Sequence, residues 1–248
     1  MKNVIPTGFE ALDEILGGGI LSDGFLLVTY NTQSLGWTLA VKIFERLLNE
    51  ENYFGIVMTY SLPFTMLKRY GWMMGLKIED YLEMDKLMDK LKIVNVFHDH
   101  NEEKSKGGLE YPWPLDPSTF LPKISKAYLK LALGKDRVVG LNITLDGLAD
   151  TLGEDVAIKI VRRGMALREV LPSNVPRPLS IMLLNKDRTS ERFTSWVTHY
   201  SDHVIDFETT KGFIERVIVR KSLLPQFSPG CLLFRYGRGE IEIIRSPE

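Results

Sequence analysis

The chain has 248 residues, of which 44% are hydrophobic and 25% are charged, so it can bury a substantial core and is not disordered throughout. Its 31 lysine and arginine residues balance 32 aspartate and glutamate residues, which gives a net charge of −1. This balance provides no overall attraction to nucleic acid or to an anionic membrane. We expect a single domain that spans residues 1–248.

The N-terminal part of the chain alternates helices and strands. Residues 10–16 carry apolar side chains at helical spacing, and Gly17, Gly18 and Gly19 then supply the positive-φ positions that end a helix. Residues 25–30 form a continuous apolar run, which is typical of a strand buried on both faces. The pattern further predicts a helix at 38–49, a strand at 54–59, a helix from Pro63 to about 74, a helix at 78–90 and a strand at 92–97.

A long polar segment, residues 99–118, interrupts this alternation. Glycine and proline recur in it, which predicts a surface loop. The alternation resumes with a helix at 119–133, a strand at 137–144, a helix at 155–171, a strand at 179–184 and a helix at 190–200. After His203 the pattern changes to short strands joined by turns, at 204–208, 213–219, 231–236 and 240–244. We therefore predict an α/β fold with a mainly parallel central sheet flanked by helices and a C-terminal antiparallel extension.

The sequence motifs at both ends of the chain resemble those of the RecA superfamily, specifically its KaiC-like archaeal branch. The resemblance rests on residues 6–13 running into 16–20, on the strand at 26–28 before Thr38, and on Asp202 to Ile205 with residues 217–221. The chain is also similar to a group of uncharacterised KaiC-like proteins from hyperthermophilic archaea. This resemblance covers nearly the whole chain and implies a RecA-like P-loop fold.

The loop after the first long strand departs from the family's nucleotide-binding loop. That loop reads G-x-x-x-x-G-K-[ST], because glycines let backbone amides wrap the phosphates and the lysine reaches the β and γ oxygens. Aligned on Thr38, the lysine becomes Gly36; a shift of one residue puts Trp37 there instead. A lysine about 4 Å from a phosphate is worth roughly 4 kcal/mol, about a thousandfold in affinity. The resemblance implies a degenerate loop formed by Asn31, Thr32, Gln33, Ser34, Leu35, Gly36, Trp37 and Thr38.

Other positions of the ATPase pattern are also changed. Where the KaiC-like pattern has a pair of glutamates, residues 59–62 contain no carboxylate. The Mg²⁺-coordinating aspartate falls on Leu141, although a longer strand would recruit Asp146. The family's lysine and arginine near the last strands become Lys221 and Leu223. The resemblance thus implies a pseudo-ATPase that hydrolyses no ATP, has no catalytic residue and holds no cofactor.

Two sets of side chains suggest alternative chemistry. His98 with His100, and His199 with His203, have spacings that can present nitrogens to a metal. A RecA-like topology gives no reason for the two sets to meet, and His203 lies inside the closing motif, so we expect no metal site. The second set is the basic side chains at 159–168 on one predicted helix, which could contact DNA phosphates. We favour a solvated face, because acidic residues on the same helix balance them.

We interpret the chain as a non-catalytic scaffold or regulatory module that binds a protein or peptide partner, including another copy of itself. Binding would use an exposed strand edge or an apolar groove. Aromatic side chains anchor interfaces, so we expect the partner to contact Tyr111, Trp113, Leu115 and Phe120. Packing of this segment on its own domain is the alternative. A nucleotide-binding sensor or weak ATPase and a nucleic-acid accessory protein are the competing functions.

The chain carries no visible targeting signal. Its N-terminus lacks the apolar core of a signal peptide, and no uncharged apolar run approaches the length of a membrane span. Cys231 is the only cysteine, which excludes an internal disulfide and is typical of a reducing compartment. We expect a cytoplasmic protein.

Overall fold

The computed structural model describes residues 4–73, 90–95, 108–110, 117–210, 214–237 and 240–245. The strands are β1 (Val4–Ile5), β2 (Ile20–Leu21), β3 (Phe25–Tyr30), β4 (Phe54–Thr59), β5 (Leu91–Asn95), β6 (Gly108–Glu110), β7 (Val138–Ile143), β8 (Leu179–Asn185), β9 (His203–Thr209), β10 (Ile214–Ser222), β11 (Gly230–Gly237) and β12 (Glu240–Arg245). The helices are α1 (Glu10–Leu16), α2 (Trp37–Asn49), α3 (Phe64–Met73), α5 (Pro117–Ala132), α6 (Leu145–Leu152), α7 (Glu154–Glu169) and α8 (Glu191–Tyr200).

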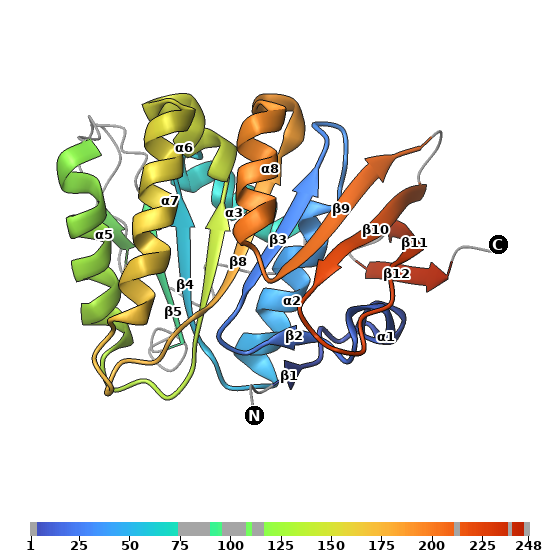
Figure 1. Cartoon of the computed structure of the whole chain (residues 1–248), viewed down its shortest axis with the longest axis horizontal. Coiled ribbons are helices and arrows are strands. Elements are labelled where there is room, and N and C mark those ends of the chain that lie inside the picture. Colours follow the sequence, from blue (N-terminus) through green and yellow to red (C-terminus); the bar gives the residue numbers. More distant parts are fainter. Residues whose placement is uncertain are drawn as a thin grey trace.

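One large mixed sheet organises the molecule (Figure 1). Its strand order is β12-β11-β10-β9-β3-β8-β7-β4-β5-β6, and β1 and β2 form a separate antiparallel pair. Neighbouring strands from β9 to β6 are parallel. The strands from β9 to β12 are antiparallel to one another. The carboxyl ends of the parallel strands therefore meet at one edge of the sheet.

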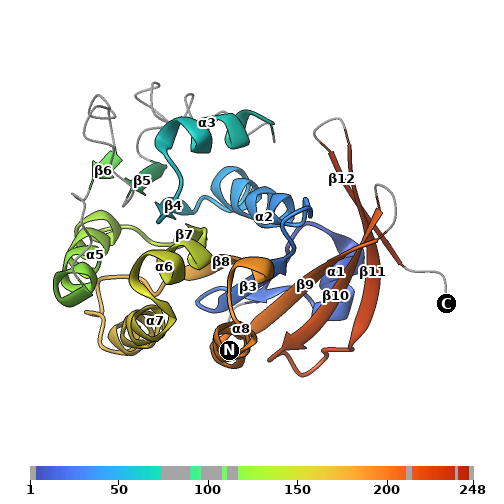
Figure 2. The ribbon, with the colours of Figure 1, turned by 90° about the horizontal axis from the view of Figure 1, so that it is seen from above.

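Helices cover both faces of the sheet. Figure 2 shows α2 and α3 on one face and α5, α6, α7 and α8 on the other. Because alternate strand residues point to opposite faces, the core has two halves. Leu26 and Val28 of β3 belong to the half that packs against α1 and α2, whereas Leu27 belongs to the half with α6, α7 and α8. This double covering explains why the central strands are continuous apolar runs.

Helix α1 ends at the glycines that the sequence singles out. Gly17 adopts φ 93°, in the left-handed region where a side chain is strained. The N–H of Gly18 then donates to the carbonyl of Asp13 at 2.7 Å, which caps the helix. The chain is thereby turned into β2 and back toward β3.

The structure confirms the predicted fold class and corrects three details. Residues 204–208, predicted as the start of the antiparallel extension, belong to β9, which pairs in parallel with β3. The reason is that α8 carries the chain back across the sheet, and a crossover of this kind joins parallel strands. Helix α6 was not predicted, because it is short and only Gly153, at φ 80°, separates it from α7.

The third correction concerns the segment predicted as a surface loop at 99–118. Strand β6 and the first residues of α5 lie within it. Most of the helix predicted at 78–90 lies outside the described residues. In the part of the chain that the structure describes, no helix combines the length and the apolar character needed to cross a membrane.

Candidate functional site

The loop that joins β3 to α2, residues 31–36, is held by a carboxylate from β10. The backbone N–H of Leu35 donates to Glu215 at 2.7 Å, and the Ser34 hydroxyl donates to the other oxygen of the same carboxylate. The N–H of Gly36 in turn donates to the Ser34 hydroxyl oxygen at 2.9 Å. Glu215 is itself buried. A carboxylate of the protein therefore lies at the start of α2, where a helix N-terminus favours an anion.

The first half of the same loop is bound by Asp187, which follows β8. Its carboxylate accepts hydrogen bonds from the Thr32 N–H at 2.7 Å and from the Asn31 side-chain amide at 2.7 Å. These bonds, that from the Thr32 backbone above all, hold the pKa of Asp187 below its usual range. The loop is thus fixed at both ends by carboxylates of the protein.

Bulky side chains surround the positions where either alignment would place the lysine of an ATPase loop. A side chain at Gly36 would collide with the ring of Phe207. Trp37 contacts Tyr70 of α3 edge to face, with ring centroids 5.3 Å apart. Both positions are therefore part of the packing around α2.

A charge network around one buried carboxylate lies beside this loop. Asp206 of β9 accepts hydrogen bonds from Lys186 at 2.5 Å, from Arg220 at 2.5 Å and from the Thr29 hydroxyl at 2.7 Å. Lys186 also donates to the carbonyl oxygen of Phe207 at 3.1 Å. A buried carboxylate needs such partners, because an unpaired charge in the interior costs on the order of several kcal/mol. Sequence analysis missed the network, because its members meet only when β3, β8, β9 and β10 lie side by side.

The other positions that sequence analysis assigned to the ATPase pattern, near β4 and β7, are buried or paired with other residues of the protein. The Tyr60 hydroxyl donates to the side-chain oxygen of Asn142 at 3.0 Å. Leu141 is buried in β7. Asp146 lies in the first turn of α6, where burial raises its pKa, and it pairs with Arg188 at 2.9 Å.

Lys221 and Leu223, the two positions of the ATPase pattern near the C-terminus, lie in different environments. Lys221 donates to the carbonyl oxygen of His199 at 2.8 Å, near the end of α8, where a cation complements the helix dipole. Leu223 is exposed. Neither side chain takes part in the contacts of residues 31–36 described above.

His203 is buried and has a structural environment. Its Nε2 accepts a hydrogen bond from the Leu21 N–H at 3.0 Å, and its Nδ1 lies 3.1 Å from the Ser222 hydroxyl. Ser222 donates its own proton to the carbonyl of Leu16, so Nδ1 carries the imidazole proton. Burial lowers the pKa of His203 to about 4. The described residues contain no cluster of three potential metal ligands, and His98 and His100 lie outside them.

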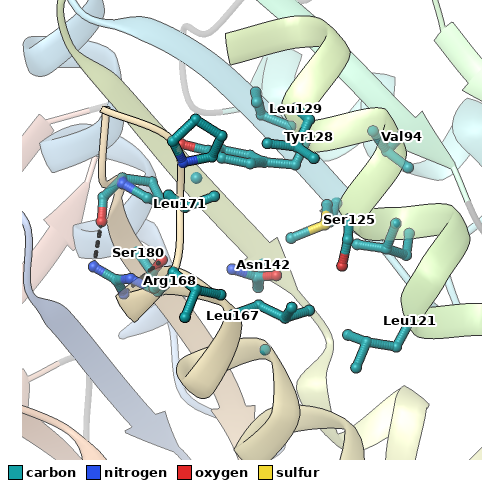
Figure 3. A pocket seen from close by; sticks show the side chains of 18 residues that line it. Val94, Leu121, Ser125, Tyr128, Leu129, Asn142, Leu167, Arg168, Leu171 and Ser180 are labelled. Atoms are coloured by element: carbon teal, nitrogen blue, oxygen red, sulfur yellow. Dashed lines mark hydrogen bonds between the residues drawn. The ribbon is translucent and has the colours of Figure 1, made fainter. Parts of the chain in front are cut away.

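A cavity of about 220 Å³ with a mostly apolar lining lies between α5 and α7, above β4, β7 and β8 (Figure 3). We call it the α5–α7 groove. Two glycines make room for it: a Cβ at Gly164 would have nothing within 4 Å, and a Cβ at Gly140 would lie 3.9 Å from its nearest neighbour. The groove is lined by Ile56, Met58, Val94, Leu121, Ile124, Ser125, Tyr128, Leu129, Gly140, Asn142, Gly164, Leu167, Arg168, Val170, Leu171, Pro172, Pro178 and Ser180.

The rim of the groove exposes apolar side chains to solvent. Leu129 is 36% exposed, Leu167 38% and Val170 73%. Figure 3 places Arg168 and Leu121 at opposite sides of the cavity. Exposed apolar residues that gather around a hollow are unusual on a protein surface without a binding role.

The arginine and the tyrosine of the groove are already bound within the protein. Arg168 donates to the carbonyl of Pro178 at 2.7 Å and stacks on Phe25, 3.9 Å from the ring centroid. The Tyr128 hydroxyl donates to the carbonyl of Pro176 at 2.6 Å. Arg168 therefore anchors the fold and is not part of a free DNA-binding face. The remaining basic residues of that predicted face, Lys159, Arg162 and Arg163, are exposed.

Of the aromatic segment predicted to contact a partner, only Phe120 is described. It is 4% exposed and packs against Tyr60, with ring centroids 6.2 Å apart, so its side chain belongs to the core. Tyr111, Trp113 and Leu115 lie outside the described residues. Leu121, which follows Phe120, lines the groove.

The strand order and the position of the loop before α2 define an α/β protein with a RecA-like fold. No protein-family model and no curated protein sequence matches the chain. A KaiC-like protein from the archaeon Pyrococcus horikoshii OT3 superposes with a TM-score of 0.72 at 17% identity, over 98% of this chain and 99% of that one. An uncharacterised protein from Pyrococcus horikoshii, crystallised in complex with an unknown peptide, superposes with a TM-score of 0.79 at 19% identity, over 98% and 100% of the two chains. The chain therefore shares the fold of a KaiC-like protein.

Proposed function

We propose that this protein is a non-catalytic, cytoplasmic binding protein with a RecA/KaiC-like fold, and that it binds an extended segment of a partner protein in the α5–α7 groove. The observation that carries the proposal is the open apolar groove with its exposed rim. Its Tyr128 and Arg168 side chains are occupied and most of its lining is apolar, so a ligand gains mainly by burying apolar side chains there. The crystallised complex of the similar Pyrococcus horikoshii protein supports a peptide as the class of ligand.

Charge near the groove favours a segment with acidic residues around its apolar anchors. Helix α5 carries three lysines and no acidic residue. Lys126 and Lys130 of α5 are exposed, and so are Arg162 and Arg163 of α7. Opposite charges at the rim of an interface speed association and select the partner.

The loop at residues 31–36 supports the absence of ATPase activity. It lacks the lysine of an ATPase loop, and Glu215 and Asp187 accept hydrogen bonds from its amides. A nucleotide-binding sensor or weak ATPase would need those amides for phosphate oxygens. A nucleic-acid accessory protein would need a larger basic surface than the near-neutral chain provides.

The test is to select binders from a random peptide library and measure their affinity for variants that fill the groove. In Gly140→Val, the new side chain enters the groove, and valine suits a strand. We expect wild-type protein to select peptides with apolar anchors and acidic flanks. Affinity should fall about tenfold or more in Gly140→Val, because the filled groove no longer buries an anchor side chain.

The matched control is Gly237→Val, which makes the same change in β11, where the new Cβ has nothing within 4 Å. It should bind the selected peptides as wild-type protein does. Equal affinity of both variants, or no selected peptide at all, would contradict the proposal. Unfolding curves for each variant show whether a loss of affinity reflects a loss of folded protein.

A further inference from the structure

Asn142 is a polar residue at the floor of the α5–α7 groove. It belongs to β7, is 8% exposed and is one of the residues that line the groove. Figure 3 shows its side chain in the middle of the groove, between Leu167 of α7 and Ser125 of α5. A buried amide needs hydrogen-bond partners, because an unpaired one is costly. The partners of Asn142 therefore indicate what the groove can bind.

The oxygen of the Asn142 side chain is bound within the protein. Oδ1 accepts a hydrogen bond from the Tyr60 hydroxyl at 3.0 Å. Tyr60 is buried, and burial raises its pKa, so its phenol keeps the proton that it donates. Because the amide group is planar, this bond leaves Nδ2 of Asn142 pointing away from Tyr60.

The nitrogen of the same side chain, Nδ2, has no partner. Its N–H groups donate no hydrogen bond to any residue that the structure describes. Nδ2 is not enclosed either, because the enclosed side-chain nitrogen and oxygen atoms without a partner in the described residues belong to Thr144 and Asp146. Nδ2 therefore has surface that is open to the groove. An unpaired donor at the floor of an apolar groove indicates that the ligand supplies an acceptor.

The groove offers this acceptor no free positive charge. Arg168 is the only lysine or arginine among the residues that line the groove. Its guanidinium donates to the carbonyls of Asp23 and Pro178. Burial lowers the pKa of Arg168, and the carboxylates of Asp202 and Asp23 oppose this shift, so the protein itself balances the charge. A carboxylate in the groove would lose its water without gaining a free cation, which favours a neutral acceptor.

We propose that Asn142 selects the ligand of the α5–α7 groove, and that the anchor side chain which enters the groove has an apolar stem and a carboxamide at its tip. This inference rests on the proposed function, because it concerns the same groove. The carboxamide oxygen accepts from Nδ2, and its N–H donates to the second lone pair of Oδ1.

Glutamine is the amino acid whose side chain combines these features. Its stem suits the apolar lining of the groove, and its tip pairs with Asn142. A leucine anchor would leave Nδ2 unpaired, and a glutamate anchor would bury a charge.

Pentanamide is a suitable probe, because it carries the carboxamide of a glutamine side chain on an apolar chain and needs no peptide. Its binding is followed by the side-chain NH₂ resonances of Asn142, which are assigned by their loss in Asn142→Leu. Pentanamide should shift these resonances in a saturable way. Pentanoate, which has the same chain but is charged, should bind about tenfold more weakly, because its carboxylate finds no free cation.

A double variant removes the amide without leaving the Tyr60 hydroxyl unpaired. Tyr60→Phe combined with Asn142→Leu replaces both partners of one hydrogen bond by apolar groups of similar size, so the protein should stay folded. The backbone N–H resonance of Gly164, which lines the groove, reports binding in this variant. Pentanamide affinity should fall about tenfold. Tyr60→Phe alone keeps the amide of Asn142 and should lose less affinity.

The proposal is wrong if the Asn142 resonances do not respond up to the solubility limit of pentanamide, if the double variant binds pentanamide as wild-type protein does, or if pentanoate binds as tightly as pentanamide. The peptide library is a separate measurement. Selected peptides that are lost in Gly140→Val but bind the double variant as tightly as wild-type protein would keep the proposed function and reject the role of Asn142. Pentanamide binding that depends on Asn142, with no peptide selected, would reject the proposed function and keep the carboxamide site.

Discussion

The loop before α2 and the α5–α7 groove differ in which groups have partners inside the protein. In the loop, polar groups find partners inside the protein: Glu215 and Asp187 accept the hydrogen bonds of its amides. In the groove, apolar side chains such as Val170 remain in contact with solvent. Since unpaired polar groups are costly and exposed apolar groups gain by being covered, these loop amides are already satisfied, whereas the groove gains by being covered.

The comparison teaches where to look for a binding site in a chain with a RecA-like fold. The loop before α2 lies between a parallel strand and the helix that follows it, but its hydrogen bonds are internal. The α5–α7 groove, with its exposed apolar rim, lies on the other face of the sheet, between helices. Fold alone therefore does not locate the binding site.

The largest effect should come from opening the closed loop. Glu215→Ala leaves the Ser34 hydroxyl and the Leu35 N–H without their charged acceptor, and each such bond is worth about 1.5–3 kcal/mol. We expect the free energy of unfolding to fall by about 3 kcal/mol, as measured in urea. Glu215→Gln, which keeps an acceptor, should lose less. A loss below about 0.5 kcal/mol would mean that the carboxylate does not hold the loop.

Acid should lower the free energy of unfolding through His203, which lies on the α1–α2 side of the sheet and away from the groove. The folded pKa of His203 is lowered to about 4 from 6.5, so the unfolded chain binds the proton more readily. Stability is therefore full above pH 6.5 and declines as the pH falls toward 4, by about 3 kcal/mol in total. Urea unfolding across this range, compared with His203→Gln, measures the effect. If the Cε1 proton resonance of His203, assigned by its loss in His203→Gln, titrates near pH 6.5, the prediction is wrong.

A glycine-to-alanine pair compares the two regions directly. At Gly36 the new methyl group meets the Phe207 ring, and overpacking of this kind costs about 1–3 kcal/mol. At Gly164, inside α7, it enters open space, and alanine should stabilise the helix by about 0.5–1 kcal/mol. Unfolding in urea should thus show opposite signs. The same sign for both would mean that the groove closes in solution.

Much of the fold could be predicted from the sequence, because periodicity and turn residues are local signals. The apolar run of β3 and the glycines after α1 act on their own neighbours in the chain. The parallel pairing of β9 with β3 is set by the path of α8 across the sheet, which no local pattern reports.

The candidate sites were predicted less well than the fold. The departure at residues 31–38 is visible in the sequence, because a motif with fixed spacing exposes its own departures, and a degenerate loop there stays a prediction. The residues of the groove were not predicted, since Gly140 and Gly164 come from different elements and their role is the absence of a side chain.

The smallest effect should be that of ATP on wild-type protein. Without the lysine, and with the loop amides bound to Glu215 and Asp187, the site has little to offer a phosphate. If the dissociation constant exceeds the ATP concentration tenfold, stabilisation is only about 0.06 kcal/mol, below what a melting curve resolves. We therefore expect no shift in Tm with Mg²⁺ and ATP, and no phosphate release.

A shift equivalent to about 1 kcal/mol in wild-type protein, together with steady phosphate release, would reverse the comparison and make the loop the active site. The same titration of Glu215→Ala separates the two causes of closure. A response to ATP that appears only in this variant would mean that the carboxylate of Glu215 excludes phosphate. No response in either protein would mean that the missing lysine is sufficient, because the freed amides alone do not hold the nucleotide.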